Sequence, residues 1–210
     1  ITERNGNPIE STYLNRGVGE LLHENRSEDL NNIDIIEEPA IYLGWWFDHY
    51  GHFMTETLSR HFALAKASGR LALFHAPYGK KNSHFDYIFE NACGSKPIFF
   101  TKPTLLKNTI VPEPAFIPRR EVYSAFNSFA LNCDVRENNK IHAPVYFSRR
   151  YLPSNKIDDD EHAKAEKLLS ESGFLIVYPE FLSVSDQQII FNSHDYFCGY
   201  IGSALHTVIS

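Results

Sequence analysis

Acidic and imidazole side chains cluster between a strand predicted over residues 40–44 and the helix predicted after it. The cluster contains Asp48, His49, His52 and Glu56. Ligands of open α/β sheets bind beyond the carboxyl ends of the strands, so we expect this loop to hold the chemistry. These residue types suit general acid–base catalysis, in which an imidazole accepts a proton from a reacting hydroxyl group.

His52 is the candidate for the base. Gly51 allows a tight turn just before it, which places His52 at the start of a helix predicted over residues 52–68. The positive end of a helix lowers the pKa of a histidine placed there and keeps the imidazole neutral. Glu56 lies one turn further along the same face, and either Glu56 or Asp48 can orient the ring or take the proton itself.

Two other interpretations of the same residues stay open. His52 can simply cap the helix, with Asp48 and His49 as solvated loop residues. The spacing of His49, His52 and Glu56 also suits metal ligands, although the HExxH pattern of zinc enzymes is lacking. On that interpretation Asp48, His49, His52 and Glu56 serve a metal-dependent hydrolase.

A second candidate site follows a strand predicted over residues 145–148, where Arg149 and Arg150 stand side by side. Guanidinium groups bind phosphate with two parallel hydrogen bonds, so an arginine pair at a strand end can clamp a diphosphate. Adjacent strand residues point to opposite faces. We therefore expect one arginine to contact the ligand and the other to pair with an acidic neighbour. The alternative is a surface ion pair with the acidic run 158–161.

A third candidate site is the glycine-rich turn after a strand predicted over residues 196–198. It continues into a presumed helix and contains Gly199, Gly202, Ser203, Ala204 and Leu205. Such turns present backbone N–H groups to an anion at a helix N-terminus. The pattern is neither GxGxxG nor a P-loop, so it does not indicate a dinucleotide site or a P-loop nucleotidase.

These pieces, taken in order, resemble glycosyltransferase family 61. The family's carboxyl-half signature is similar to a strand ending in Ser148-Arg149, then "GFLIVYPE", "LSVSDQQIIF" with Gln187, and "CGYIGSALH". The segments "GHF" and "ETL" around His52 and Glu56 are similar to its amino-half motif. The resemblance covers residues 38–75 and 144–206. One departure is His206, which stands where the family often has asparagine.

The resemblance implies an inverting transfer of a hexose or pentose from a nucleotide-sugar donor to a hydroxyl group of a glycan or other acceptor. It implies two Rossmann-like domains of the GT-B type, and a role in surface or capsular polysaccharide synthesis. The donor-binding residues would be Arg149, Arg150, Gln187, Gly199, Gly202, Ser203, Ala204 and Leu205. We expect no metal or cofactor, because no Asp-x-Asp motif lies at a strand end. The alternative outside enzymes is an inactive nucleotide- or carbohydrate-binding module.

The order of predicted elements favours an α/β fold with parallel sheets, because strands alternate with helices. Strands are predicted over residues 40–44, 71–75, 97–100, 107–111, 145–148, 174–178 and 196–198. Helices are predicted over residues 52–68, 85–92, 121–133, 158–172 and 185–193. We expect residues 113–120, which are rich in proline, to link two domains.

The expected domains are residues 1–138, with an irregular and partly helical lead-in, and residues 139–210. The first is expected to bind the acceptor and the second the nucleotide sugar. The chain begins without methionine and closes at Ser210, soon after the glycine-rich turn. We therefore expect the second domain to be incomplete in this chain.

Composition excludes several classes of protein. With 20 basic and 26 acidic residues, the net charge is −6, which does not suit a nucleic-acid-binding protein. The three cysteines include no CxxC pair, so neither a disulfide framework nor a zinc ribbon is predicted. No apolar run is long enough to span a bilayer. The sequence predicts a cytoplasmic location, with a membrane-peripheral site or, for a eukaryotic source, the secretory lumen as alternatives.

Overall fold

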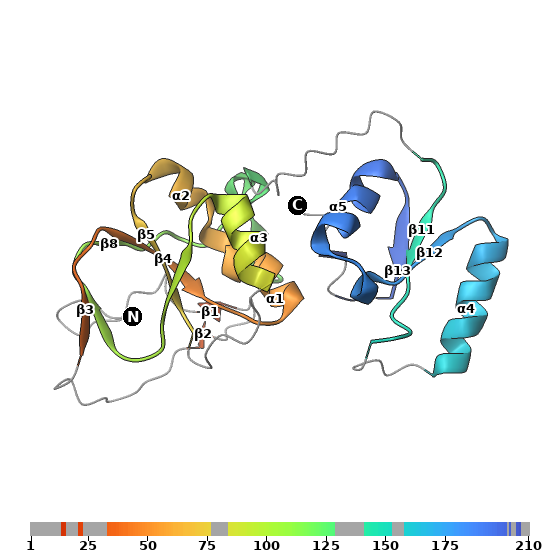
Figure 1. Ribbon diagram of the computed structural model, residues 1–210, viewed down its shortest axis with the longest axis horizontal. Coiled ribbons are helices and arrows are strands. Elements are labelled where there is room, and N and C mark those ends of the chain that lie inside the picture. Colours follow the sequence, from red (N-terminus) through yellow and green to blue (C-terminus); the bar gives the residue numbers. More distant parts are fainter. Residues whose placement is uncertain are drawn as a thin grey trace. The chain divides into compact units, whose positions relative to one another are not determined.

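The chain divides into two compact units, Ile1–Leu131 and Asn132–Ser210 (Figure 1). This computed structural model describes residues 14–15, 21–22, 33–76, 84–128, 141–152, 158–200, 202 and 205–206. Both units are mixed α/β and contain parallel sheets, as the sequence predicts. The division between the units and the expected boundary at residue 138 both fall in residues 129–140, outside the described part.

The first unit is built on a parallel sheet of four strands in the order β6-β5-β4-β8. The strands are β4 (Ala40–Trp45), β5 (Leu71–His75), β6 (Pro97–Phe100) and β8 (Thr109–Ile110). Among the described residues of this unit, three two-stranded sheets accompany it. They pair β3 (Asp34–Ile36) with β7 (Thr104–Leu106), β1 (Leu14–Asn15) with β2 (Leu21–Leu22), and β9 (Phe116–Ile117) with β10 (Glu121–Val122).

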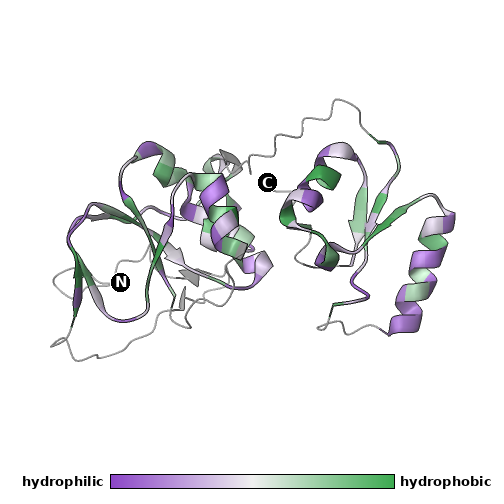
Figure 2. Ribbon diagram, viewed as in Figure 1, coloured by the Kyte–Doolittle hydropathy of each residue, from purple (hydrophilic) through white to green (hydrophobic). Residues whose placement is uncertain are grey.

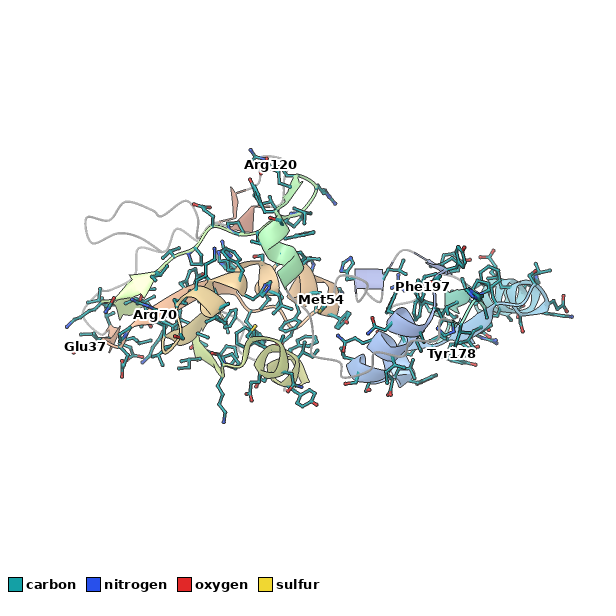
Figure 3. All side chains as sticks on the ribbon, turned by 90° about the horizontal axis from the view of Figure 1, so that it is seen from above. Glu37, Met54, Arg70, Arg120, Tyr178 and Phe197 are labelled. Carbon is teal, nitrogen blue, oxygen red and sulfur yellow. The ribbon has the colours of Figure 1, made fainter. Side chains whose placement is uncertain are left out.

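Aromatic rings seal one face of the main sheet. The ring of Trp46 meets Phe74 of β5 at 5.0 Å and Phe99 of β6 at 4.8 Å, both edge-on. It also meets Phe53 of α1 (Tyr50–Thr55) and Phe89 of α3 (His84–Cys93), so these two helices cover this face. Edge-on pairs add about 0.5–1.5 kcal/mol each beyond the burial of their surface. Figure 3 shows Met54, which is fully buried, within the unit and Glu37 and Arg120 on its outside.

The helix predicted over residues 52–68 is wrong as a single element. The chain forms α1, then the 3-10 helix η2 (Thr57–Arg60), then α2 (Phe62–Lys66). The hydroxyl groups of Thr57 and Ser59 bond to backbone atoms, at Trp45 and Glu56 respectively. Short polar side chains that bond to the backbone compete with helical hydrogen bonds, which explains the break.

The predictions for residues 107–133 are also corrected. The strand expected over residues 107–111 is reduced to β8, because residues 107–108 form a bend and the preceding strand, β7, ends before the expected range begins. The expected linker over residues 113–120 belongs to the first unit instead, because the Ala115 amide donates to the Ser59 carbonyl at 2.8 Å. In place of a helix over residues 121–133, β10 is followed by the 3-10 helix η3 (Ser124–Ser128), and residues 129–133 lie outside the described part.

The expected partly helical lead-in is largely outside the described residues. Where residues 1–36 are described, they form the short strands β1, β2 and β3 rather than helix. The amide of Lys107 donates to the Ile36 carbonyl at 3.0 Å, just beyond the pairing of β3 with β7. The end of the lead-in is therefore part of a sheet, because its backbone groups are hydrogen-bonded to those of β7 and the residue that follows β7.

The second unit has a parallel sheet of three strands in the order β12-β11-β13. The strands are β11 (Val145–Phe147), β12 (Leu175–Val177) and β13 (Phe197–Gly199). The helices α4 (Asp159–Glu171) and α5 (Val184–Ser193) lie on opposite sides of the sheet (Figure 1). All five elements appear where the sequence predicts them, within one or two residues at their ends.

Local signals explain the helices of the second unit. The carboxylate of Asp158 accepts a hydrogen bond from the backbone amide of Asp160 and caps α4, and Ser183 caps α5 in the same way. The exposed side of α4 is hydrophilic along most of its length (Figure 2). Val145, Phe147 and Val177 form the core, and partly buried residues of α5 and β13 pack against it. In the described part of the chain, no helix has the length and apolar character needed to cross a bilayer.

Gly44 offers a test of the first unit, because it has a φ of +106° beneath the buried guanidinium of Arg60. A Cβ atom added there would lie 2.6 Å from Nη1 of Arg60. Gly44→Ala should lower the free energy of unfolding by about 2–4 kcal/mol, since backbone strain and overpacking add. Gly69 has a φ of +80° with open space around it, so Gly69→Ala should cost only about 1–2 kcal/mol. Denaturant unfolding followed by tryptophan fluorescence measures both, and equal losses would contradict the packing argument.

Candidate functional site

His52 and Glu56 form a hydrogen-bonded pair on the first unit. Nδ1 of His52 bonds Oε1 of Glu56 one helical turn away. The side chain of His52 is 41% exposed, whereas that of Glu56 is only 6% exposed. A carboxylate that accepts a hydrogen bond from Nδ1 leaves Nε2 as the ring atom that can accept a proton. The pair is therefore a buried acid holding an accessible imidazole.

Helix α1 positions this pair, although His52 is its third residue rather than its first. Phe53 anchors the helix because its ring is fully buried and stacks on Phe85 at 4.6 Å. The Glu56 amide donates to the His52 carbonyl at 2.8 Å, which ends the helix. With six residues, α1 is too short for the helix-dipole effect expected from the sequence, and Glu56 supplies the electrostatic partner instead.

Asp48 and His49 lie in the turn before α1. Asp48 is half-buried, and His49 is exposed at the N-cap position with no side-chain capping bond. The ring of His49 lies 5.1 Å from that of His52. His52 is therefore not the cap of this helix. Among the described residues, no three or more histidine, cysteine or acidic side chains are arranged to hold a metal ion.

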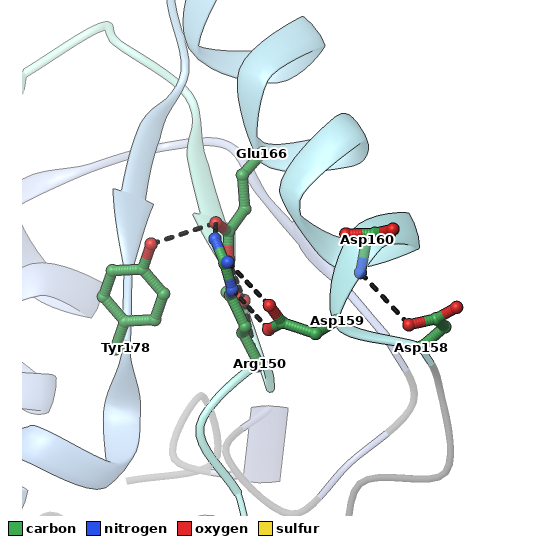
Figure 4. Close-up of polar contacts among 7 residues, drawn as sticks. Arg150, Asp158, Asp159, Asp160, Glu166 and Tyr178 are labelled. Atoms are coloured by element: carbon green, nitrogen blue, oxygen red, sulfur yellow. Dashed lines mark hydrogen bonds and ion pairs between the residues drawn. The ribbon is translucent and has the colours of Figure 1, made fainter.

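On the second unit, Arg150 is bound to acidic residues of α4, as predicted for one arginine of the pair (Figure 4). Its Nε and Nη2 atoms donate to the two carboxylate oxygens of Asp159 at 2.6 and 2.9 Å, and Nη1 donates to Glu166 at 3.2 Å. The hydrogen bonds to Asp159 and then to Glu166 raise the pKa of Arg150. The hydrogen bond from Arg150 lowers the pKa of Asp159.

Glu166 is the centre of this network and was not predicted from the sequence. It is almost fully buried and accepts hydrogen bonds from Ser148 at 2.6 Å, from Tyr178 at 3.1 Å and from Arg150. The network joins β11, α4 and the end of β12. The one sequence signal that could have indicated Glu166 is a carboxylate on the side of α4 that faces the sheet. Its partners are distant in sequence, so the network itself could not be predicted.

Arg149 lies instead against the glycine-rich turn. A Cβ atom added to Gly202 would lie 3.0 Å from Nη1 of Arg149 and 3.2 Å from its Cδ. A Cβ atom added to Gly199 would lie 2.7 Å from the carbonyl oxygen of Phe147. Glycine at both positions therefore lets the turn approach β11 and lets the arginine cross it.

Topology places these residues where open α/β sheets commonly bind ligands. After β11 the chain passes to β12 on one side and then crosses back to β13 on the other, so the strand order reverses between β11 and β13. Open α/β sheets bind ligands at the carboxyl ends of the strands at such a switch point. Arg149 and Gly202 follow the ends of β11 and β13, and the structure brings them together there.

The other predicted donor-binding residues have different positions. Ser203 and Ala204 lie outside the described residues. Leu205 packs against the core of the second unit, and its amide donates to the Gly202 carbonyl at 3.3 Å. Gln187 is buried, and its amide nitrogen donates to the Pro179 carbonyl at 3.1 Å. Leu205 and Gln187 thus have contacts that support the turns around them.

The chain matches the family model described as Glycosyltransferase 61 over residues 50–210. This match covers well over half of the chain, which therefore belongs to glycosyltransferase family 61, a family of sugar-transferring enzymes. The resemblance inferred from the sequence is confirmed. The matched range includes the His52–Glu56 pair, both arginines and the glycine-rich turn. No curated protein and no solved structure matches the chain.

The two arginines should differ in their effect on stability. Arg150→Ala should lower the melting temperature of the second unit, because it leaves the buried carboxylate of Glu166 without its cation. Arg149→Ala should have a smaller effect. The Asp159 pKa is below its unfolded value, so the pairing stabilises the fold above about pH 4 and is lost as the pH falls below that. Thermal unfolding at pH 7 and pH 3 tests this. The difference in melting temperature between wild type and Arg150→Ala should shrink at pH 3, and an unchanged difference would contradict the prediction.

Proposed function

We propose that the chain carries the catalytic residues of an inverting, metal-independent glycosyltransferase. It would move a sugar from a nucleotide-sugar donor to a hydroxyl group of an acceptor, without a cofactor. The observation that carries the proposal is the His52–Glu56 pair, in which a buried carboxylate orients an accessible imidazole. This arrangement suits a general base that must deprotonate a hydroxyl group near neutral pH.

The reaction assigns a role to each group. Nε2 of His52 takes the proton as the acceptor oxygen bonds to the anomeric carbon of the donor sugar. The bond from that carbon to the phosphate oxygen breaks on the opposite face, so the configuration inverts. Glu56 stabilises the imidazolium that forms, as the acid of a catalytic triad does. Asp48, half-buried four residues before His52, is the alternative base.

The leaving nucleoside diphosphate gains negative charge as the bond breaks. Arg149 and the backbone N–H groups of the turn from Gly199 to Leu205 would stabilise this charge at the switch point of the second sheet. Arg150 would act indirectly, because its guanidinium is held by Asp159 and Glu166. Gln187 would support the fold around the site through its bond to the Pro179 carbonyl.

The two units take different roles in this proposal. The first, expected over residues 1–138, would bind the acceptor, and the second, over residues 139–210, the donor, as in enzymes of the GT-B type. Parallel α/β sheets in both units support Rossmann-like domains. A role in surface or capsular polysaccharide synthesis is proposed from the family alone.

His52 is tested by substitution. His52→Ala should lower kcat by about 10²–10⁴, the usual contribution of a general base, while the affinity for nucleoside diphosphate stays nearly unchanged. Glu56→Gln should have a smaller effect, since its amide oxygen can still accept from Nδ1 but carries no charge. Initial rates with labelled donor and equilibrium nucleotide binding measure both. A His52→Ala enzyme with near-normal kcat would assign the base to Asp48 or Glu56, and Asp48→Asn is the matched variant that distinguishes them.

Arg149 is tested by comparison with its neighbour. Arg149→Ala should weaken nucleoside diphosphate binding by roughly 10- to 150-fold, because a charged hydrogen bond to phosphate contributes about 1.5–3 kcal/mol. Arg150→Ala should weaken binding less at a temperature where the protein remains folded. Equal effects of the two substitutions on nucleotide affinity would refute the assignment of Arg149.

Metal independence is tested by chelation. EDTA should leave the transfer rate unchanged, whereas a metal-dependent hydrolase would lose activity.

A further inference from the structure

Three neighbouring strands of the first unit end in aromatic side chains. Trp45 closes β4, His75 closes β5 and Phe100 closes β6, and these residues pair in register across the sheet. The rings of Trp45 and His75 meet edge-on at 5.4 Å, and those of His75 and Phe100 stack at 5.4 Å with an interplanar angle of 20°. In-register residues of parallel strands share a face, so the three rings form one row at the carboxyl end of the sheet.

The row continues to the candidate base. The ring of Trp45 stacks with that of Phe47 at 6.2 Å, and the ring of Phe47 lies 5.4 Å from that of His52. Trp45, Phe47, His52, His75 and Phe100 therefore form an unbroken series of five rings, which we call the aromatic strip. One end of the strip is the His52–Glu56 pair.

The strip is not part of the sealed core. Trp46, Phe74 and Phe99 face the other side of the sheet, where Trp46 is 5% exposed and Phe74 is fully buried. All five rings of the strip are only half-buried. Aromatic surface left partly exposed at the carboxyl ends of parallel strands lies where open α/β sheets bind ligands.

Backbone hydrogen bonds hold the strip in place. The Thr57 hydroxyl donates to the Trp45 carbonyl and accepts from the Phe47 amide, each at 3.0 Å. Thr57 itself is almost fully buried. The segment that carries two rings of the strip is thus fixed to the helical segment that follows the candidate base, so both are presented on one rigid support.

The chemistry of the strip suits a sugar ring. A pyranose has faces of C–H bonds, which pack on aromatic rings, and a rim of hydroxyl groups, which hydrogen-bond to imidazole nitrogens. The strip offers the carbon rings of Trp45, Phe47 and Phe100 together with the imidazoles of His52 and His75. A purely apolar ligand such as a lipid chain would cover Nε2 of His52 without offering it a hydrogen bond, which is unfavourable in a desolvated contact.

We propose that the aromatic strip is the acceptor subsite and that its ligand is a glycan. A pyranose ring stacks on Trp45 and Phe47, with one of its hydroxyl groups at Nε2 of His52. The proposal rests on the proposed function, because the role of His52 as base makes the bound sugar an acceptor. It adds the class of acceptor and the residues that select it.

The test measures glycan binding separately from catalysis. Xylotetraose, cellotetraose and maltotetraose are titrated against the protein, and binding is followed by saturation-transfer NMR and tryptophan fluorescence. At least one should bind the wild type at millimolar concentration. Trp45→Ala and Phe47→Ala should each weaken that binding by about fivefold or more. Tyr87→Ala, which removes a 60% exposed ring on α3 of the same unit, should leave it unchanged.

Phe47→Leu keeps an apolar side chain of similar reach and serves as the second variant if Trp45→Ala fails to fold. It should also weaken glycan binding, because the flat ring face is lost. In transfer assays Trp45→Ala should raise the KM for the acceptor while nucleoside diphosphate affinity stays at the wild-type value. No glycan binding by the wild type, or equal losses in Trp45→Ala and Tyr87→Ala, would overturn the proposal.

The two proposals fail in different ways. If glycans bind through the strip but no donor supports transfer or hydrolysis, the acceptor subsite stands and the proposed transferase mechanism falls. If His52→Ala abolishes transfer while Trp45→Ala and Phe47→Ala keep normal glycan affinity and acceptor KM, the mechanism stands and the strip is refuted.

Discussion

The hydroxyl group of Thr57 makes the two hydrogen bonds on which the arrangement of the first unit depends. By bonding the Trp45 carbonyl and the Phe47 amide, it ties the end of β4 to the helical segments that follow. The chain leaves the α-helix at this point, so Glu56 ends α1 with its carboxylate directed at His52. One buried side chain thus couples the strand end, with two rings of the aromatic strip, to the acid–imidazole pair, because Trp45 and Phe47 are its hydrogen-bonding partners and Glu56 is the preceding residue.

In the second unit, the side chain of Glu166 joins several elements by buried hydrogen bonds, as that of Thr57 does in the first. A carboxylate buried among Ser148, Tyr178 and Arg150 must be fully hydrogen-bonded to be tolerated there, and these partners satisfy it. Acidic residues of α4 hold the side chain of Arg150, whereas the side chain of the preceding residue, Arg149, lies along the glycine-rich turn. Of the two adjacent arginines, Arg150 therefore supports the fold, and Arg149 lies at the candidate ligand-binding edge.

Much of the second unit could be predicted from its sequence because its signals are local. Asp158 and Ser183 mark the starts of α4 and α5, and short apolar runs mark the strands between them. The first unit was harder to predict. Its apolar pattern over residues 52–68 suits one helix, and only a distant backbone partner at Trp45 makes Thr57 interrupt it. Likewise, the hydrogen bond from Ala115 to Ser59 draws a proline-rich stretch into the first unit.

The sequence by itself determined that the chain is α/β, that its candidate chemistry lies at strand ends, and that its motifs are those of glycosyltransferase family 61. These conclusions depend on residue types and on the order of short segments, which are local properties. Only the tertiary structure decided that Glu56 is the partner of His52, that Arg149 rather than Arg150 lies against Gly202, and that five rings line up beside the candidate base. The reason is physical: side-chain direction and pairing depend on sheet register and on buried hydrogen bonds between residues far apart in the sequence.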